Sequence, residues 1–406
     1  MALRDPAKPP SKGIQIGIAA LLVFIVIGLV GGIIWYNFEK SAGLTIDTAE
    51  RLLAASSDDT VHRIELFYEP VLAIVALASR VPQISEMTTR ERDDRAALVI
   101  SGLRRYRQLF SLYVGYDNGD FDMVTRVDGE ERSAARKTLG APDTAFFAHE
   151  VIRAEADGQR RAVWTFLDES GATIGEPAAT EAAFDPRVRQ WYRLAQADDK
   201  VHRSDPYIFA SSQEIGITLS RKLDGASQGV FGADLAVREV SNFLAEKKIS
   251  SSSEAFLFND RGEIIAFPDD SKIRRAVKNE QESTLIPTTI ASLGDPAIAA
   301  LYERVQKQGD QRMMRLEVDG RTYLSQVVPI MQRVGEADYL GMVAPVDEIT
   351  APINRIRTDA LMYSLAVLLL VLPLYVTLVF VWLDRRLGQT SFSAADLRDF
   401  DTRDLD

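Results

Sequence analysis

The sequence predicts an α+β protein in which two antiparallel-sheet modules stack behind one long N-terminal helix, with a transmembrane helix at each end. Two uncharged apolar runs, residues 14–36 and 361–383, enclose most of the chain. A helical spacing of apolar residues follows the first run. The spacing then changes to short alternating runs separated by turn residues, a pattern typical of strands joined in hairpins.

Each apolar run is long enough to cross a bilayer as a helix, since ~20 residues rising about 1.5 Å each span about 30 Å. Gln15 is the one strongly polar residue of residues 14–36, and residues 361–383 carry no charge. Basic residues lie in the preceding residues 1–13 and in the following residues 384–406. The positive-inside rule therefore places both termini in the cytoplasm and the intervening chain outside, with the first span kept as a signal anchor.

Residues 40–80 are predicted to form one long amphipathic helix that leaves the first span. Its apolar residues recur at helical spacing between acidic and basic ones. Pro70 lies inside this pattern and is expected to kink the helix or divide it in two, because proline lacks a backbone N–H and clashes with the preceding turn. A second helical stretch is predicted at residues 92–108.

The membrane-distal module is predicted over residues 90–248. It contains a β-hairpin whose arms, residues 111–116 and 121–127, flank an Asn-Gly dipeptide suited to a tight turn. Further strands are predicted at residues 161–167, 214–223 and 230–236.

One short helix is predicted inside this distal module, over residues 185–195. Asp185 would be its N-cap and Pro186 its first residue, which are the positions these residue types favour. The module is therefore expected to combine an antiparallel sheet with short helices.

The membrane-proximal module is predicted over residues 250–346 and has a similar construction. Its strands are expected as two hairpins and a fifth strand, at residues 254–258 with 263–267, 312–318 with 321–329, and 339–346. Residues 347–359 are then expected to form a helix that runs into the second span.

Composition excludes several classes of function. The chain has 406 residues, 46% of them hydrophobic, and a net charge of −11, so it can bury a core but is a poor partner for nucleic acid. It has no cysteine, which removes disulfides, Cys-based zinc sites and thiol catalysis, and its three histidines are widely separated. No nucleotide-binding, metalloprotease, serine-hydrolase or kinase motif occurs. We therefore expect no cofactor, no metal and no catalytic site in this chain.

Four pieces of sequence resemble a known sensor family. They are residues 184–192 (FDPRVRQWY), 205–207 (DPY), 216–219 (GITL) and 229–234 (GVFGAD). In this order and spacing they resemble the double Cache domain, a PAS-like extracytoplasmic sensor of bacterial receptors, over about residues 40–356. The phrasing is most similar to the sensor halves of adenylate/guanylate cyclases. The resemblance implies two Cache modules in the periplasm of a bacterium, anchored in its inner membrane.

The resemblance also implies a binding site for a free amino acid. Such a zwitterion needs a planar donor for its carboxylate and a nearby acceptor for its ammonium. By the family's pattern Arg189 and Trp191 would hold the carboxylate, while Tyr192, Tyr207 and Asp234 would hold the ammonium.

Phe184 departs from this pattern, because the amino-acid-binding members have a tyrosine there and phenylalanine cannot donate a hydrogen bond. An amine, an organic acid or another small polar solute is therefore an open alternative. Structural roles also stay open for the other positions: a solvated Arg189, core packing for Trp191 and Tyr192, and a helix cap for Asp234.

Three functions are compatible with the sequence. The first is a membrane-anchored sensor that signals to the cytoplasm. The second is a truncated or split sensor portion of a cyclase-type receptor, since residues 384–406 are too few for a catalytic domain. The third is a structural anchor with a vestigial pocket. A membrane-tethered hydrolase is disfavoured because no nucleophile and base pair up in the sequence. We further expect a separate effector and a parallel homodimer through the long helix, helped by the Gly28-x-x-x-Gly32 packing motif.

Overall fold

The computed structural model describes residues 12–388 except for nine short segments. These segments are residues 86–88, 130–131, 156–158, 210–213, 225–227, 247, 279–282, 309–312 and 331–337. The predictions for the basic residues within 1–11 and for most of the C-terminal tail, 389–406, lie outside the described residues. The chain divides into two compact units, Met1–Ala49 together with Thr350–Asp406, and Glu50–Ile349.

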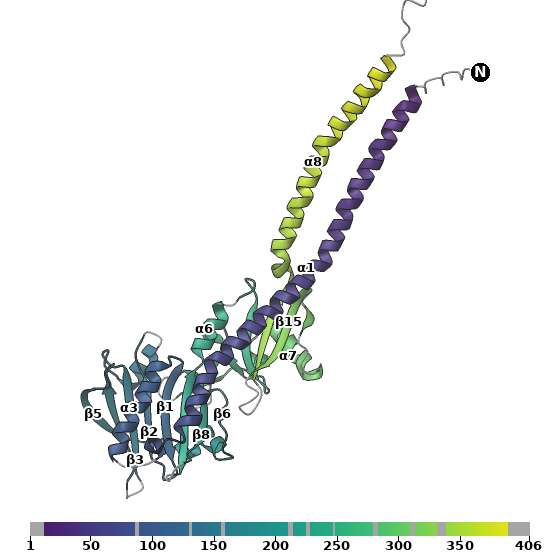
Figure 1. The fold of residues 1–406 in the computed structure, drawn as a ribbon. Coiled ribbons are helices and arrows are strands. Elements are labelled where there is room, and N and C mark those ends of the chain that lie inside the picture. The colour runs from purple at the N-terminus through teal and green to yellow at the C-terminus, as the bar shows by residue number, and fades with distance from the viewer. Residues whose placement is uncertain are drawn as a thin grey trace, which may run out of the picture. The chain divides into compact units, whose positions relative to one another are not determined.

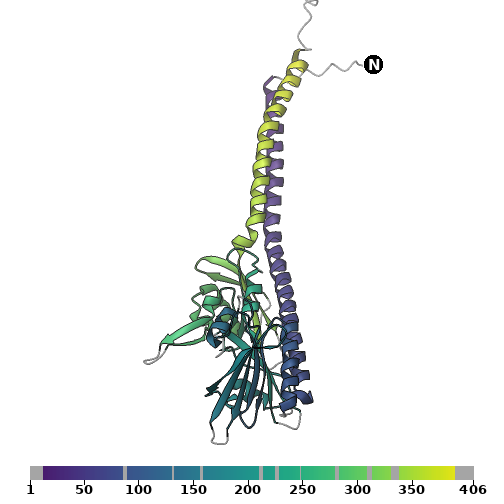
Figure 2. The same ribbon diagram turned by 90° about the vertical axis from the view of Figure 1, so that its left-hand side faces the viewer.

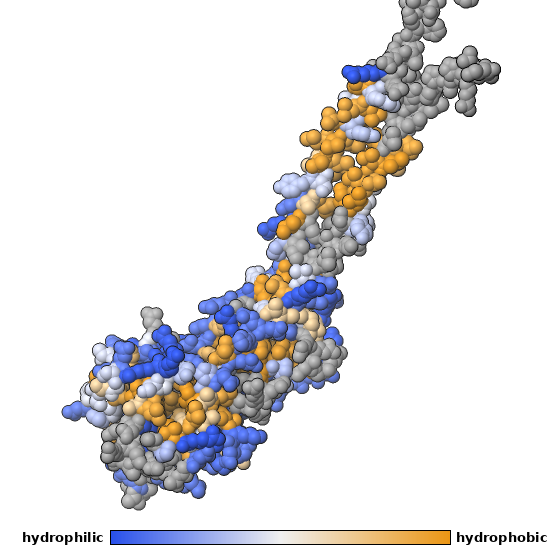
Figure 3. Space-filling model, in the orientation of Figure 1, coloured by the Kyte–Doolittle hydropathy of each residue, from blue (hydrophilic) through white to orange (hydrophobic). Residues whose placement is uncertain are grey.

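The first unit contains the outer parts of two long helices, α1 (Lys12–Ala78) and α8 (Val346–Gly388), which lie side by side there in Figure 1 and Figure 2. One helical stretch among the described residues is long and apolar enough to cross a membrane, Asn354–Val379, with a mean hydropathy of 2.3 and no buried residue in its most apolar window. A shorter apolar stretch, Val23–Tyr36, lies in α1. Figure 3 shows hydrophobic residues covering both segments. One candidate span is thus found where two were predicted.

Helix α1 runs on into the second unit without interruption, and Pro70 lies inside it. The predicted division of the helix at Pro70 is therefore wrong. Residues on both sides of the proline are buried at helical spacing, namely Ile64, Tyr68, Val71 and Val75. Burial of this apolar stripe stabilises the helix by more than the one backbone hydrogen bond that proline removes.

A nine-stranded antiparallel sheet forms the larger part of the second unit (Figure 1). Its strands are β1 (Leu109–Tyr116), β2 (Phe121–Arg126), β3 (Phe147–Ala154), β4 (Arg160–Leu167), β5 (Thr173–Glu181), β6 (His202–Arg203), β7 (Tyr207–Ile208), β8 (Ile215–Lys222) and β9 (Gly229–Ala236). Their order is β5-β4-β3-β2-β1-β9-β8-β6, and β7 pairs with β8. The predicted β1–β2 hairpin is present. Strands β3 and β5 were not predicted, because polar residues interrupt their alternation.

Short helices accompany this sheet: α2 (Pro82–Ser85), α3 (Thr89–Arg105) and α4 (Ser133–Leu139). Arg95 of α3 donates to Asp122 Oδ2 of β2 at 2.8 Å, and His149 Nε2 of β3 lies 2.8 Å from the other oxygen of that carboxylate. Asp122 and Arg95 are both buried. This network fixes α3 on one face of the sheet and leaves the opposite face for a site.

The helix predicted over residues 185–195 is two elements. Asp185 caps a 3-10 turn, Pro186–Val188, by accepting from the Arg187 N–H at 3.0 Å. Arg189 then adopts an extended backbone, with φ −80° and ψ 147°, before α5 (Gln190–Ala195) begins. The Asp185 carboxylate also pairs with Arg160 of β4 at 2.6 Å. These contacts hold Arg189 at a defined joint above the sheet.

A five-stranded antiparallel sheet, in the order β11-β10-β16-β15-β14, forms the rest of the second unit. Its strands are β10 (Glu254–Asn259), β11 (Ile264–Ala266), β14 (Met314–Val318), β15 (Arg321–Ile330) and β16 (Asp338–Pro345). Helices α6 (Arg238–Glu246) and α7 (Pro296–Gln308) and the hairpin of β12 (Arg274–Lys278) and β13 (Ser283–Pro287) accompany it. Both predicted hairpins are present, whereas α7 and the β12–β13 hairpin were not predicted.

A buried ion pair joins the two sheets. Arg203 of β6 lies 2.6 Å from Asp338 of β16, and their side chains are 2% and 1% exposed. Tyr68 of α1 lies beside this pair, and burial together with the charge of Asp338 raises the pKa of its hydroxyl. A second pair, Asp205 with Arg261, also joins the two halves. Removing one partner of the buried Arg203–Asp338 pair is expected to cost about 3–5 kcal/mol, because the other charge would be left buried and unpaired.

Candidate ligand-binding site

A cavity of about 230 Å³ lies on the face of the nine-stranded sheet opposite α3. Its lining residues are Tyr113, Phe121, Met123, Leu139, Glu150, Trp164, Phe184, Arg189, Trp191, Tyr207, Ile208, Phe209 and Asp234. The volume lies somewhat below the ~300–1,000 Å³ of sites for drug-sized molecules, so the cavity suits a small solute.

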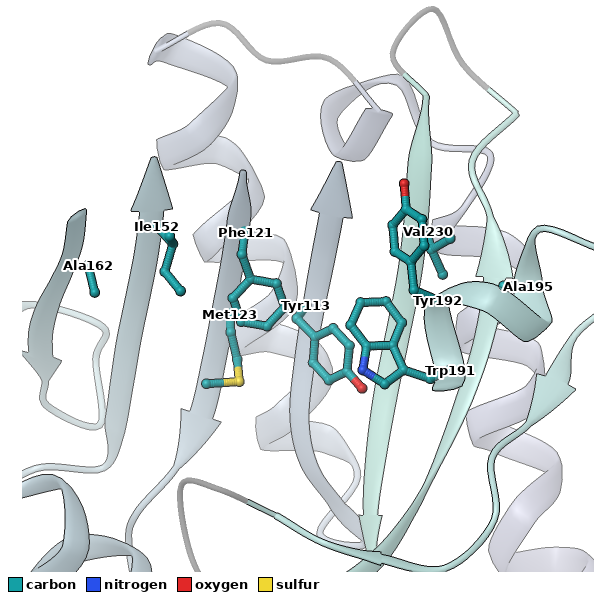
Figure 4. Close-up of a cluster of buried hydrophobic side chains, with 9 residues drawn as sticks. All are labelled: Tyr113, Phe121, Met123, Ile152, Ala162, Trp191, Tyr192, Ala195 and Val230. Carbon is teal, nitrogen blue, oxygen red and sulfur yellow. The ribbon is translucent and has the colours of Figure 1, made fainter. Parts of the chain in front are cut away.

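Strand register explains why these residues meet. Tyr113 of β1 pairs with Met123 of β2, Met123 with Glu150 of β3, and Glu150 with Trp164 of β4. Directly paired residues point to the same face of a sheet, so the four side chains form one row across four strands. Phe121 lies two residues before Met123 and points the same way. Figure 4 shows Tyr113, Phe121 and Met123 on this face, with Trp191 of α5 beside Tyr113.

Asp234 of β9 provides the acidic group of the cavity and is 6% exposed. Its Oδ1 accepts from Thr218 Oγ1 at 2.6 Å and from the Tyr113 hydroxyl at 2.7 Å. The Tyr207 hydroxyl lies 3.5 Å from the same oxygen and 2.8 Å from Thr218 Oγ1. Among the described residues none donates to Oδ2 and no cation pairs with Asp234. Three hydroxyls therefore hold a buried carboxyl that has no counter-charge.

The protonation of Asp234 reflects this imbalance. Burial raises the pKa of its carboxyl from 3.8 to about 7, although hydrogen bonds from Thr218, Tyr113 and Tyr207 favour the charged form. Burial and the neighbouring Asp234 also raise the pKa values of Tyr113 and Tyr207, which keeps both hydroxyls protonated as donors. A ligand ammonium beside Oδ2 would supply the missing charge and return the carboxyl to its ionised form.

Gly232 allows Tyr113 to reach Asp234. The two residues pair across β9 and β1, and a Cβ at Gly232 would lie 2.2 Å from the Tyr113 ring. Gly115 of β1 allows a similar close approach of Pro186 and Trp191, since a Cβ there would lie 2.7 Å from Pro186 and 2.9 Å from Trp191. Both glycines are needed for the close approach of neighbouring groups, not for a special backbone angle.

Arg189 provides the basic group of the cavity. Its guanidinium carbon lies 4.7 Å from the centroid of the Phe184 ring, which in turn lies 4.7 Å from the ring of Phe121. Arg189 is exposed, and no carboxylate among the described residues pairs with it. Phe184 thus orients the guanidinium by a cation–π contact, where a tyrosine could have added a hydrogen bond.

Five of the six predicted site residues line the cavity: Phe184, Arg189, Trp191, Tyr207 and Asp234. Tyr192 is not among the lining residues. It follows Trp191 in a helix, so it points in a different direction, and Figure 4 shows its hydroxyl directed away from that of Tyr113. The structure therefore places Tyr192 in the supporting core, and its predicted contact with a ligand ammonium is not supported by this arrangement.

Sequence reasoning missed Tyr113, Thr218 and Glu150. The alternation in β1 contains the signal for Tyr113, because an aromatic residue opposite a glycine of the next strand can lean across it. Thr218 was recognised as part of the GITL piece but without a role. Glu150 was missed because β3 was not predicted.

The raised pKa of Asp234 predicts a pH dependence of stability. An unfolded aspartate titrates near pH ~4, so between about pH 4 and pH 7 the folded chain keeps a proton that the unfolded chain has lost. The contribution of Asp234 therefore falls as the pH rises through this window, by about 1.4 kcal/mol for each pH unit, and changes little above it. Thermal or urea unfolding of the ligand-free chain in detergent at pH 5 and pH 7 measures this.

Asp234→Asn should reduce the loss of stability between pH 5 and pH 7. Glu176→Gln, which changes an exposed carboxylate on the edge strand β5, should leave it unchanged. Equal pH dependence in the wild type and Asp234→Asn would contradict the account of this carboxyl.

Comparison with known proteins gives sequence relatives and structural neighbours, whereas no family model matches the chain. The chain is 28% identical over 386 residues to adenylate cyclase 1 of Rhizobium meliloti, covering 94% of this chain and 56% of the cyclase. It is 22% identical over 217 residues to the methyl-accepting chemotaxis protein PctB of Pseudomonas aeruginosa, covering 52% of this chain and 31% of the receptor. The chain thus spans about half, or less, of the length of these relatives.

Solved structures similar to the chain include two chemoreceptor domains. The ligand-binding domain of the amino acid chemoreceptor PctC of Pseudomonas aeruginosa, in complex with GABA, has 18% identity and a TM-score of 0.45, covering 73% of this chain and 100% of that one. The domain of Campylobacter jejuni Tlp3 with 4-methylisoleucine has 14% identity and a TM-score of 0.48, covering 76% of this chain and 95% of that one. The sequence relatives are thus a cyclase and a chemotaxis receptor, which is consistent with the resemblance to a double Cache sensor.

Proposed function

We propose that this chain is a membrane-anchored sensor that binds a small zwitterionic solute in the cavity of its nine-stranded sheet. One observation carries the proposal: Arg189 and Asp234 line the same cavity, and neither has an opposite charge among the described residues. An α-amino acid presents a carboxylate and an ammonium on adjacent atoms and would complement both groups. The sequence relatives named as chemotaxis receptors support a sensory role.

We further propose that two spans place the sensor outside the cytoplasm. Asn354–Val379 would be one span, and the segment around Val23–Tyr36 would be the other. The basic residues flanking both apolar runs favour cytoplasmic termini in a bacterial inner membrane. Ligand binding would then act by favouring one of two arrangements of α1 and α8.

The base of α8 offers a route for the signal. Glu348 Oε2 accepts from Ser251 Oγ and from the Ser252 N–H, each at 2.8 Å, and Glu348 Oε1 accepts from Arg321 Nη2 at 2.8 Å. Arg321 also pairs with Asp347 at 2.9 Å. The first turn of α8 is thereby fixed to β15 and to the loop that leads into β10. A shift of the sheets would therefore move this turn and, with it, the helix that follows.

The output of the signal is part of the proposal. The alignment with adenylate cyclase 1 over 94% of this chain favours the sensor portion of a cyclase-type receptor, and the receptor relatives favour a chemotaxis-type effector. In either case the effector would read the positions of the two helices, either as a separate protein or as a further part of a longer receptor.

We also propose a parallel homodimer through α1. Leu52, Leu66 and Leu77 are each at least half exposed, at 50%, 59% and 65%. Their separations of 14 and 11 residues place them within about 40° of one another around the helix, away from the buried stripe that contains Ile64. An apolar stripe of this kind on a long helix suits pairing with a second copy, in which the two subunits could shift against each other.

Ligand binding is tested by screening amino acids, amines and organic acids against the full chain in detergent micelles. A ligand present at about 100 times its dissociation constant should stabilise the folded chain by roughly 2.7 kcal/mol in thermal unfolding. Arg189→Ala should weaken binding of a carboxylate-bearing ligand by about 10-fold to 100-fold in calorimetry, because it removes a charged hydrogen-bond donor.

Arg193→Ala is the matched control, since Arg193 is an exposed arginine of α5, the helix that begins directly after Arg189, and it does not line the cavity. Binding that Arg189→Ala leaves intact would refute the role of this arginine and leave the sensor proposal standing. The absence of any ligand in the screen would instead favour a structural anchor with a vestigial pocket.

The dimer is tested by disulfide cross-linking in membranes, because the chain has no cysteine of its own. Single cysteines at Leu52, Leu66 and Leu77 should cross-link two copies on mild oxidation. Cysteines at the exposed Asp58, on another face of α1, should cross-link far less. Equal cross-linking at all of these positions, or none at any, would contradict the proposed interface.

A further inference from the structure

Glu150 is a second acidic group in the cavity, and the proposed zwitterion clamp does not use it. It lies on β3 between Met123 and Trp164, in the row of side chains that faces the cavity. Among the described residues no hydrogen-bond donor or cation pairs with it. Burial raises the pKa of its carboxyl from 4.5 to about 7.

Buried carboxyl groups elsewhere in the same unit are paired with arginine side chains. Asp122, on the opposite face of the sheet, lies 2.8 Å from Arg95, and Glu214 lies 2.8 Å from Arg238. Asp338 lies 2.6 Å from Arg203. Asp234 is buried and Glu150 is half-buried. Neither has an arginine partner among the described residues, and both line the cavity. A carboxyl that is desolvated without a cation destabilises the fold unless another molecule compensates it.

Charge complementarity then indicates the class of ligand. With Asp234 and Glu150 ionised and Arg189 positive, the three groups carry a net charge of −1. A ligand with two cationic groups and one carboxylate, net charge +1, would pair with all three. A neutral amino acid would pair with Arg189 and Asp234 and leave Glu150 without a partner.

The positions of the strands set the length of that ligand. Strands β9 and β3 are separated by β1 and β2, and the register places Asp234 two residues along from the row that contains Glu150. The backbones that carry Asp234 and Glu150 therefore lie about 16 Å apart, at ~4.8 Å per strand and ~3.4 Å per residue. Both side chains line the same cavity, so a ligand with a chain of several methylene groups between its two cations could contact both carboxyls. Tyr113, Phe121 and Met123, on the two strands between them, line the cavity along this path, and Trp164 lies beyond Glu150 on β4.

We propose that the cavity selects a basic amino acid, with its carboxylate on Arg189, its α-ammonium on Asp234 and its terminal ammonium or guanidinium on Glu150. This inference rests on the proposed function and adds the class of ligand to it. Glu150 is the residue that determines specificity, because it alone would distinguish a basic side chain from a neutral one of equal length.

The experiment compares pairs of amino acids of similar shape that differ in charge at the end of the side chain. L-arginine and L-citrulline form one pair, and L-lysine and L-norleucine form the other. Each is titrated into the full chain in detergent micelles by isothermal calorimetry. The wild type should bind the basic member at least about tenfold more tightly, the effect of one charged hydrogen-bonded pair.

Glu150→Gln should reduce this preference to less than about threefold while retaining the weaker affinity for the neutral member. Glu176→Gln removes an exposed carboxylate on the edge strand β5, two strands from β3, and should keep the full preference. Glu150→Asp keeps the charge and should retain a preference for the basic member, which guards against loss of folding in the glutamine variant.

The outcomes separate this inference from the function on which it rests. Equal binding of basic and neutral members by the wild type would overturn the inference and leave an amino-acid sensor standing. A preference that survives unchanged in folded Glu150→Gln would also overturn it. If the wild type bound none of the four amino acids, the inference would fail together with the proposed amino-acid site.

Discussion

The carboxyl of Asp234 is buried without a counter-charge, and the arrangement of the site depends on this constraint. Its Oδ1 is fixed by Thr218 and Tyr113, which leaves Oδ2 for another group. Tyr113 can reach it only because Gly232, which is paired with Tyr113 on the neighbouring strand, has no side chain to clash with the ring. A site with this imbalance is less stable when empty than when a cation occupies it, so the cost of burying the acid becomes selectivity for a positively charged group.

Other charged groups around the site are paired, and these pairs hold in place the elements that carry the cavity. On the far face of the sheet, Arg95 and His149 satisfy Asp122 and hold α3 in place. On the near face, Asp185 and Arg160 fix the extended joint from which Arg189 projects. Between the sheets, the buried ion pair beside Tyr68 couples the cavity-bearing sheet to the sheet from which α8 leaves.

The sequence predicted the α+β class, the long helix, and both hairpins of the five-stranded sheet, since these depend on local periodicity and turn residues. It also singled out five residues that the structure brings to one cavity, because the motif fixes their chain positions. It did not predict β3 or β5. The polar Glu150 of β3 faces the cavity, and the polar residues of β5 lie on an exposed edge strand. Nor did it separate Trp191 from Tyr192, because their different directions depend on where α5 starts, after the extended Arg189. Of the two effects predicted for Pro70, a kink or a division, the division does not occur, because burial on both sides of the proline outweighs its local propensity to end a helix.

The central claim, that Asp234 is the counter-charge for a ligand cation, is tested most directly by proton release on binding. L-arginine would be titrated calorimetrically into the Glu150→Gln chain at pH 6 in two buffers with different ionisation enthalpies, so that Asp234 is the one cavity carboxyl left to titrate. Because its pKa lies near 7 in the empty site, the account predicts release of about one proton for each ligand bound. Binding with no proton release, or with proton uptake, would contradict it.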